Sequence, residues 1–110
     1  MSNEISELMR EIDAFTQERD WDQFHNPKDL AIALSVEASE LLEAYLWKQP
    51  EEAKVEKVKE ELADIINYAL LIAGKYGFDV AGIVREKLEK NALKYPIEKA
   101  RGVATKYDEL

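Results

Sequence analysis

Two pairs of acidic residues in this chain share one spacing. Glu37 and Glu40 are three residues apart, and Glu61 and Asp64 repeat that interval. Side chains three residues apart lie about 60° apart around an α-helix, so each pair occupies one face. Both pairs border apolar runs, and Glu37 stands where a hydrophobic residue is expected. If their two helices pack together, the four carboxylates can face one another.

Four carboxylates in a partly buried site require cations, because unscreened negative charges destabilise one another. The chain has no cysteine and a single histidine, so the ligands on offer are oxygens. Oxygen ligands favour hard ions, which predicts Mg²⁺ or Mn²⁺. The alternative is a set of solvated surface acids beside lysine and arginine, a common pattern in an acidic chain. Spacing alone supports both interpretations equally.

The elements that would position these acids are helices, because apolar residues recur with a helical period through most of the chain. Only four glycines and three prolines interrupt the pattern. This indicates an all-α protein, a four-helix bundle, in a single domain spanning residues 1–110, with 97–110 as an irregular tail. The expected helices run from Ile5 to about Arg19, from Asn26 to about Trp47, from the stretch 51–61 to Gly77, and from Asp79 to just before Pro96.

Several residues mark the expected helix ends. Asn26 is a favourable N-cap and Pro27 suits the first helical position. Gly77 is placed to end the third helix in a left-handed conformation, and Asp79 to cap the fourth. The third helix is apolar on nearly every side over residues 65–73, which predicts that subunits associate to cover it.

The charge balance restricts the partners. Fifteen basic against 23 acidic residues give a net charge of −8, which argues against a nucleic acid polymer or an anionic membrane surface as partner. No apolar run approaches the length of a membrane helix, and the first residues do not resemble a signal peptide. We therefore expect a cytoplasmic protein.

At this point the motifs resemble a known family. Glu37-Ala-Ser-Glu40 followed by Glu61-Leu-Ala-Asp64 resembles the Glu-x-x-Glu…Glu-x-x-Asp signature of the MazG-like, all-α nucleoside triphosphate pyrophosphohydrolases. The likeness is greater still to the dCTP pyrophosphatase branch. It is carried by residues 18–30, by residues 40–48, and by Lys94-Tyr95-Pro96 and Lys106-Tyr107.

This resemblance implies an activity and an assembly. The activity is Mg²⁺-dependent hydrolysis of a nucleoside triphosphate, preferably dCTP or a modified dCTP, between its α- and β-phosphates. Such an enzyme clears unwanted nucleotides from the pool. The bundle would be completed in a homodimer or homotetramer. The metal-binding and catalytic residues it implies are Glu37, Glu40, Glu61 and Asp64.

The resemblance also implies residues for the substrate. Around the base it places Trp21, His25, Trp47 and Tyr68, and for the phosphates it indicates Lys87, Asn91, Lys94 and Tyr95. Trp47 can equally be a core residue, and the basic end of the fourth helix can equally be explained by the helix dipole. Asn67 departs from the pattern, since an apolar residue is expected there.

Other functions remain open at the level of sequence. The same fold can prefer dUTP or accept nucleotides broadly, or serve as a non-catalytic nucleotide-binding oligomerisation module. Four intact acids argue against the module. A di-iron bundle would need Glu-x-x-His pairs, whereas the one histidine, His25, lies in an expected loop.

Overall fold

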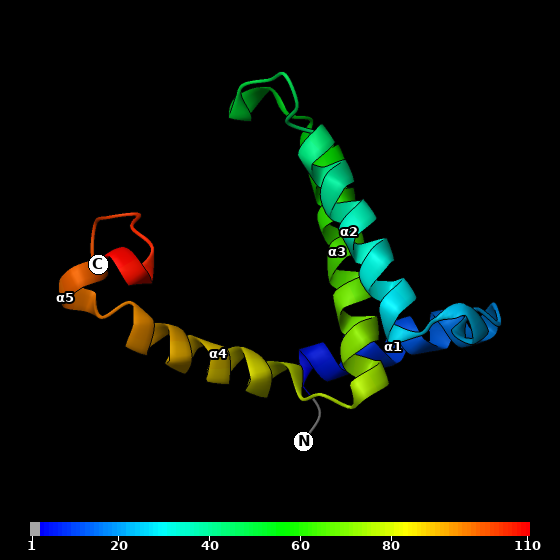
Figure 1. Cartoon of the computed structure of the whole chain (residues 1–110). Coiled ribbons are helices and arrows are strands. Elements are labelled where there is room, and N and C mark those ends of the chain that lie inside the picture. Colours follow the sequence, from blue (N-terminus) through cyan, green and yellow to red (C-terminus); the bar gives the residue numbers. More distant parts are fainter. Residues whose placement is uncertain (1–2) are drawn as a thin grey trace. The chain divides into compact units, whose positions relative to one another are not determined.

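The computed structural model describes residues 3–110, and every regular element in that range is helical (Figure 1). The all-α class expected from the sequence is confirmed. The structure divides into two compact units, Met1–Phe78 and Asp79–Leu110. The elements are α1 (Glu4–Glu18), η1 (Asp22–Phe24), α2 (Pro27–Glu43), η2 (Pro50–Glu52), α3 (Val55–Tyr76), α4 (Val80–Lys94), α5 (Ile97–Ala100) and η3 (Tyr107–Glu109), where η marks a 3-10 helix.

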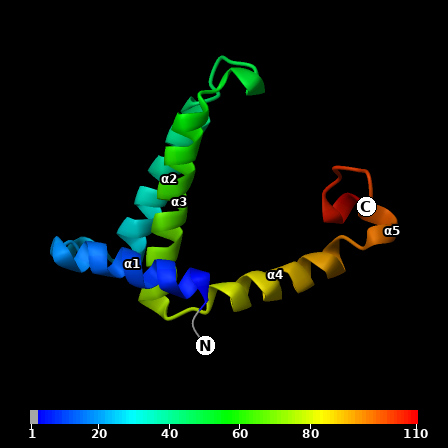
Figure 2. The ribbon, with the colours of Figure 1, turned by 180° about the vertical axis from the view of Figure 1, so that it is seen from behind.

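The first unit is built on α2 and α3, which run side by side (Figures 1 and 2). Leu30 of α2 and Leu70 of α3 are buried, and the small residues Ala44 and Ala73 are buried with them. Helix α1 packs against α3. The pairing of α2 with α3 matters for the site, because these two helices carry the four acids singled out by their spacing.

Two expected helix ends are confirmed. The Asn26 side chain accepts a hydrogen bond from the Asp29 N–H at 2.9 Å and so caps the start of α2. Gly77 ends α3 with φ +69°, a conformation that costs glycine little because it has no Cβ. The first expected helix also appears, as α1.

Of two other boundaries, one was predicted wrongly and one is confirmed. Helix α2 ends at Glu43 rather than near Trp47, because the N–H groups of the residues after it bond to carbonyls three positions back. Trp47 itself has φ +63°, which no α-helix tolerates. Helix α3 begins at Val55, inside the expected stretch 51–61, because the Gln49 N–H bonds to the Glu52 carboxylate at 2.9 Å and closes η2 as a separate turn before it.

The second unit consists of α4 and the segment after it. Asp79 occupies the N-cap position of α4, as expected, but its side chain makes no capping hydrogen bond. The carboxylate lies instead over Gly82, where an added Cβ would stand 2.6 Å from Asp79 Oδ2. Glycine at this position therefore leaves room for the acid.

The segment 97–110 was expected to be irregular throughout, and part of it is helical. Pro96 precedes α5, a single turn, and η3 follows near the C-terminus. The Tyr107 ring packs edge-on against Tyr95, with 6.0 Å between centroids, and Lys94 Nζ lies 4.8 Å from the Tyr107 centroid. These contacts hold the last residues of the chain against the end of α4.

Many large apolar side chains remain exposed in the single chain. Ile32 and Val36 of α2 are 53% and 51% exposed, and Ile66 of α3 is 47% exposed. Soluble monomers seldom leave so many apolar side chains uncovered. Among the described residues, no helix combines the length and hydropathy needed to cross a bilayer.

Candidate active site

Three of the four acids singled out by their spacing meet between α2 and α3. Glu37 of α2 and Glu61 and Asp64 of α3 each offer an oxygen, and these oxygens lie within 4.8 Å of one another. Glu40 is outside this group of three, yet its negative charge acts on Glu37. The packing of the two helices thus brings the two sequence motifs together.

Two oxygens of this acid cluster lack a partner. Glu37 Oε2 and Glu61 Oε2 are buried and accept no hydrogen bond from the described residues. The other Glu61 oxygen lies 3.8 Å from Lys57 Nζ, and the Glu61 side chain is only 12% exposed. Because an ionised carboxylate can only accept, facing oxygens need either a proton or a cation between them.

The electrostatics of the cluster follow from that geometry. The pKa of Glu37 rises from 4.5 to about 7, chiefly because its protonated form can hydrogen-bond Glu61 and because it is desolvated. The nearby charges of Glu40 and Asp64 raise the pKa further. The orphaned oxygens and the all-carboxylate donor set fit a hard divalent cation such as Mg²⁺ or Mn²⁺.

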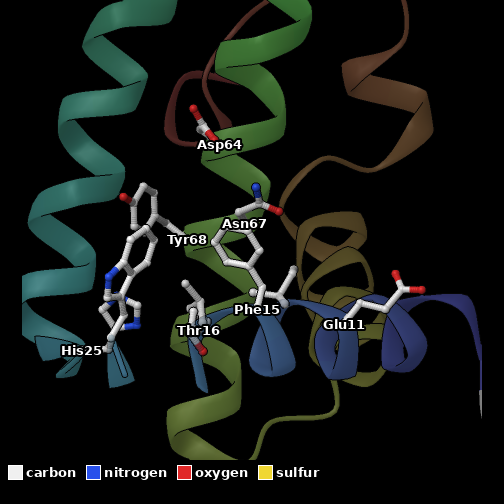
Figure 3. Close-up of a pocket in the computed structure, with 10 residues that line it drawn as sticks. Glu11, Phe15, Thr16, His25, Asp64, Asn67 and Tyr68 are labelled. Atoms are coloured by element: carbon white, nitrogen blue, oxygen red, sulfur yellow. The ribbon is translucent and has the colours of Figure 1, made fainter. Parts of the chain in front are cut away.

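A cavity of about 460 Å³ adjoins the acids (Figure 3). One wall comes from α3, which contributes Asp64 and Tyr68, and the other comes from α1 and the chain between α1 and α2. Asp64 belongs both to the cavity wall and to the acid cluster. A ligand in the cavity would therefore lie directly beside the proposed cation.

Three of the four residues expected around a base line this cavity: Trp21, His25 and Tyr68. His25 Nδ1 is buried without a hydrogen-bond partner among the described residues, and Figure 3 shows the ring at the cavity beside the start of α2. Burial, followed by the charges of Glu37 and Asp64, raises the pKa of Tyr68. Its hydroxyl therefore keeps its proton at neutral pH and can donate a hydrogen bond.

Helix α1 holds Trp21 at the cavity. The backbone N–H of Trp21 donates a hydrogen bond to the Thr16 carbonyl at 2.9 Å. The Trp21 ring packs edge-on against Phe15, with 5.7 Å between ring centroids. The Arg19 guanidinium stacks on the Phe15 ring at 3.7 Å. The Phe15 ring and the Thr16 carbonyl thus hold Trp21 after the end of α1.

The remaining expected residues do not line the cavity. Trp47 is 95% exposed and follows the far end of α2, a helix of 17 residues. At 1.5 Å per residue that helix is about 25 Å long, and Trp21 precedes its opposite end. The four expected phosphate-binding residues lie in the second unit, on α4 or immediately after it: Lys87, Asn91, Lys94 and Tyr95.

Sequence reasoning did not anticipate part of the cavity wall. Ile12 and Phe15 belong to an apolar stripe and were expected only to pack α1, but Phe15 is 48% exposed and lines the cavity. Two polar residues indicate that this wall is not ordinary helix packing. Thr16 is only 3% exposed, and the Asn67 amide interrupts an apolar run. The unanticipated lining residues are Glu11, Ile12, Phe15, Thr16 and Leu71, whereas Asn67 was singled out as a departure from the family pattern and also lines the cavity.

Comparison with known proteins identifies relatives of this chain. The dCTP pyrophosphatase 1 of Bos taurus is 35% identical over 114 residues, covering 96% of this chain and 68% of its own, and the Homo sapiens protein of that name is 33% identical, covering 96% and 67%. The crystal structure of a pyrophosphatase from Archaeoglobus fulgidus superposes with a TM-score of 0.80 at 32% identity, covering 87% of this chain and 95% of its own. The model of the MazG-like family matches residues 32–110. The chain therefore belongs to the MazG-like family, as its motifs predicted.

Proposed function

We propose that this nucleoside triphosphate pyrophosphatase depends on Mg²⁺ and prefers dCTP or a modified dCTP. It cleaves between the α- and β-phosphates and releases a monophosphate and pyrophosphate. The observation that carries the proposal is the acid cluster beside an aromatic-lined cavity, with Asp64 common to both. The names of the relatives, 33–35% identical to this chain, support the choice of nucleotide.

The acids have the first role in this proposal. Glu37, Glu40, Glu61 and Asp64 would hold the divalent ion. When bound there, Mg²⁺ or Mn²⁺ would supply positive charge that screens the phosphate oxygens and makes the attacking water more acidic. A glutamate of the cluster accepts the proton of that water.

The cavity has the second role. Trp21 offers an aromatic face to the base, and stacking contributes about 1–3 kcal/mol per base. The Tyr68 hydroxyl can donate to the ring carbonyl of cytosine. His25 Nδ1, buried without a partner among the described residues, can accept from the exocyclic amine. A pyrimidine with both groups would satisfy both side chains.

The assembly completes the site. The match to residues 32–110 crosses the boundary between the two units, which supports a single functional domain over 1–110. Within it Lys87, Asn91, Lys94 and Tyr95 bind the phosphates.

Trp47, 95% exposed in the single chain, packs at the substrate site in a homodimer or homotetramer. The role that follows is removal of unwanted nucleotides from the cytoplasmic pool.

Product analysis tests the proposal. The protein is incubated with each common dNTP and NTP and with 5-methyl-dCTP, in Mg²⁺ or in EDTA. We expect monophosphate and pyrophosphate, highest kcat/KM for the deoxycytidine nucleotides, and no turnover in EDTA. Glu61→Gln should lower kcat by at least about 100-fold, because it removes a charged ligand of the cation. Glu60→Gln, at the adjacent exposed acid, is the matched control and should retain activity.

Three results would contradict parts of the proposal. Diphosphate and free phosphate would place the cleavage at another bond. Equal or faster turnover of dUTP would replace the cytidine preference with a broad or dUTP-like one. A folded protein that binds nucleotide with Mg²⁺ but turns over none would be a non-catalytic module.

A further inference from the structure

One close ion pair joins the last turn of α3 to the segment that carries Trp21 and His25. Lys75 Nζ donates to Asp22 Oδ1 at 2.6 Å, across 53 positions of sequence. Two further ion pairs among the described residues are local: Arg19 with Glu18 and Lys57 with Glu61, one and four positions apart. The Lys75–Asp22 pair therefore ties together two segments that are distant in the chain.

Asp22 has a particular place in that segment. It opens η1, directly after Trp21, and the His25 N–H bonds to the Asp22 carbonyl at 3.0 Å. The Phe24 N–H bonds to the Trp21 carbonyl at 2.9 Å. Because η1 is a single closed turn, fixing Asp22 fixes the backbone on both sides of it.

Hydrophobic burial does little to anchor η1. Phe24, its one large apolar residue, is 63% exposed, and Trp21 is 45% exposed. A short turn without a buried side chain is held by its hydrogen bonds and charges. The contact with Lys75 is thus a main connection between η1 and α3.

The pair lies behind the substrate cavity rather than in it. Lys75 and Asp22 line a second cavity of about 250 Å³, which shares Ile12 and Leu71 with the first. Neither charged residue lines the first cavity, whereas the neighbours Trp21 and His25 do. Any influence of Lys75 on a bound nucleotide therefore passes through η1.

We propose that Lys75 and Asp22 are positioning residues that hold Trp21 and His25 against the substrate cavity. The effect on catalysis rests on the function proposed above, while the effect on η1 does not depend on it. The hydrogen bond from Lys75 is the chief reason that the pKa of Asp22 is lowered, so the Asp22 carboxylate stays ionised at neutral pH. The pair has side chains 26% (Lys75) and 44% (Asp22) exposed and should contribute little to global stability.

Steady-state kinetics provides the first test. Lys75→Met should raise KM for dCTP by about three- to tenfold and leave kcat within about twofold, because a displaced η1 weakens binding of the base without touching the acids. Lys59→Met, at an exposed position on the same helix, is the matched control and should leave KM unchanged. Lys75→Arg should also retain KM. The reversed pair, Asp22→Lys with Lys75→Asp, should restore it, which loss of a merely stabilising residue would not allow.

Fluorescence provides a second test that needs no turnover. The chain has two tryptophans, so Trp47→Phe leaves Trp21 as the sole indole. In that background Lys75→Met should increase acrylamide quenching of Trp21, and Lys59→Met should not.

The outcomes separate the two proposals. Unchanged quenching and unchanged KM in Lys75→Met would overturn the positioning role, as would a loss confined to kcat. If the wild-type protein turns over no nucleotide, the proposed function fails. The quenching of Trp21 then decides the positioning role alone, increased quenching supporting it and unchanged quenching overturning it.

Discussion

Glu37 shows how one side chain can favour cation binding and oppose folding in the absence of a cation. It is half-buried beside Glu61, with Glu40 and Asp64 nearby, and its pKa rises to about 7. An ionised Glu37 therefore repels its neighbours unless a proton or a metal ion lies between them. The same repulsion gives the cluster its attraction for a divalent ion.

This has a consequence for stability that Glu37→Gln can isolate. The pKa of Glu37 is 4.5 in the unfolded chain and about 7 in the folded one, so the folded state binds the extra proton between these values. Stability should fall as pH rises through that interval, and the penalty is complete above pH 7. In EDTA, the Tm of the wild type should drop between pH 5.5 and pH 8 by about 5 °C more than that of Glu37→Gln.

The control is Glu43→Gln, at an exposed acid of the same helix, which should keep the wild-type pH dependence. In excess Mg²⁺ at pH 8, the Tm of the wild type should instead exceed that of Glu37→Gln. Parallel pH profiles for the wild type and Glu37→Gln in EDTA would contradict this account.

At the same scale, the acid cluster could be predicted from the sequence and the cavity wall could not. A three-residue interval on a helix is local geometry, so Glu61 and Asp64 had to share a face. Phe15 carried no such information, because an apolar stripe looks the same whether another helix or a ligand covers it. Only the packing of α1 against α3 reveals which part of the stripe stays open.

At the scale of elements, helix ends that depend on one residue were predicted well, and ends that depend on competing turns were not. Asn26 caps the start of α2 with its own side chain, as expected. Gly77 ends α3 through its own backbone freedom, also as expected. The end of α2 instead depends on a change to three-residue hydrogen bonding after Glu43. That change has no single-residue signature.

Two glycines near the end of α3 should respond oppositely to the same substitution. Gly77 has φ +69°, so Gly77→Ala should lower the free energy of unfolding by about 1 kcal/mol. Gly74 lies inside the helix, where an added Cβ would contact Met9 Cε at an ordinary 3.9 Å. Gly74→Ala should raise that free energy by about 0.5–1 kcal/mol. Urea denaturation of the two variants measures both, and the same sign for both would refute the assignment of the helix end.

At the scale of the whole molecule, the exposed apolar side chains predict self-association. Light scattering should give two or four times the chain mass of 12.6 kDa. Ile32 and Val36 are one turn apart on α2 and both exposed, so Ile32→Glu with Val36→Glu should lower the measured mass and preserve the helical circular dichroism.

Lys59→Glu makes the same change in net charge at an exposed polar position and should not dissociate the assembly. A wild-type mass of 12.6 kDa at micromolar concentration would contradict the prediction. The sequence predicted association because residues 65–73 are apolar on nearly every side of α3. The partner face could not be predicted, because periodicity does not say which stripe each neighbour covers.

The two walls of the cavity differ in their match to the model of the MazG-like family. The wall from α3, together with all four acids, lies inside the stretch that the MazG-like family shares, residues 32–110. The facing wall, from Glu11 to His25, lies before it. Substitutions within these fifteen consecutive residues can therefore reshape one wall of the cavity while all four acids stay in place on the other side.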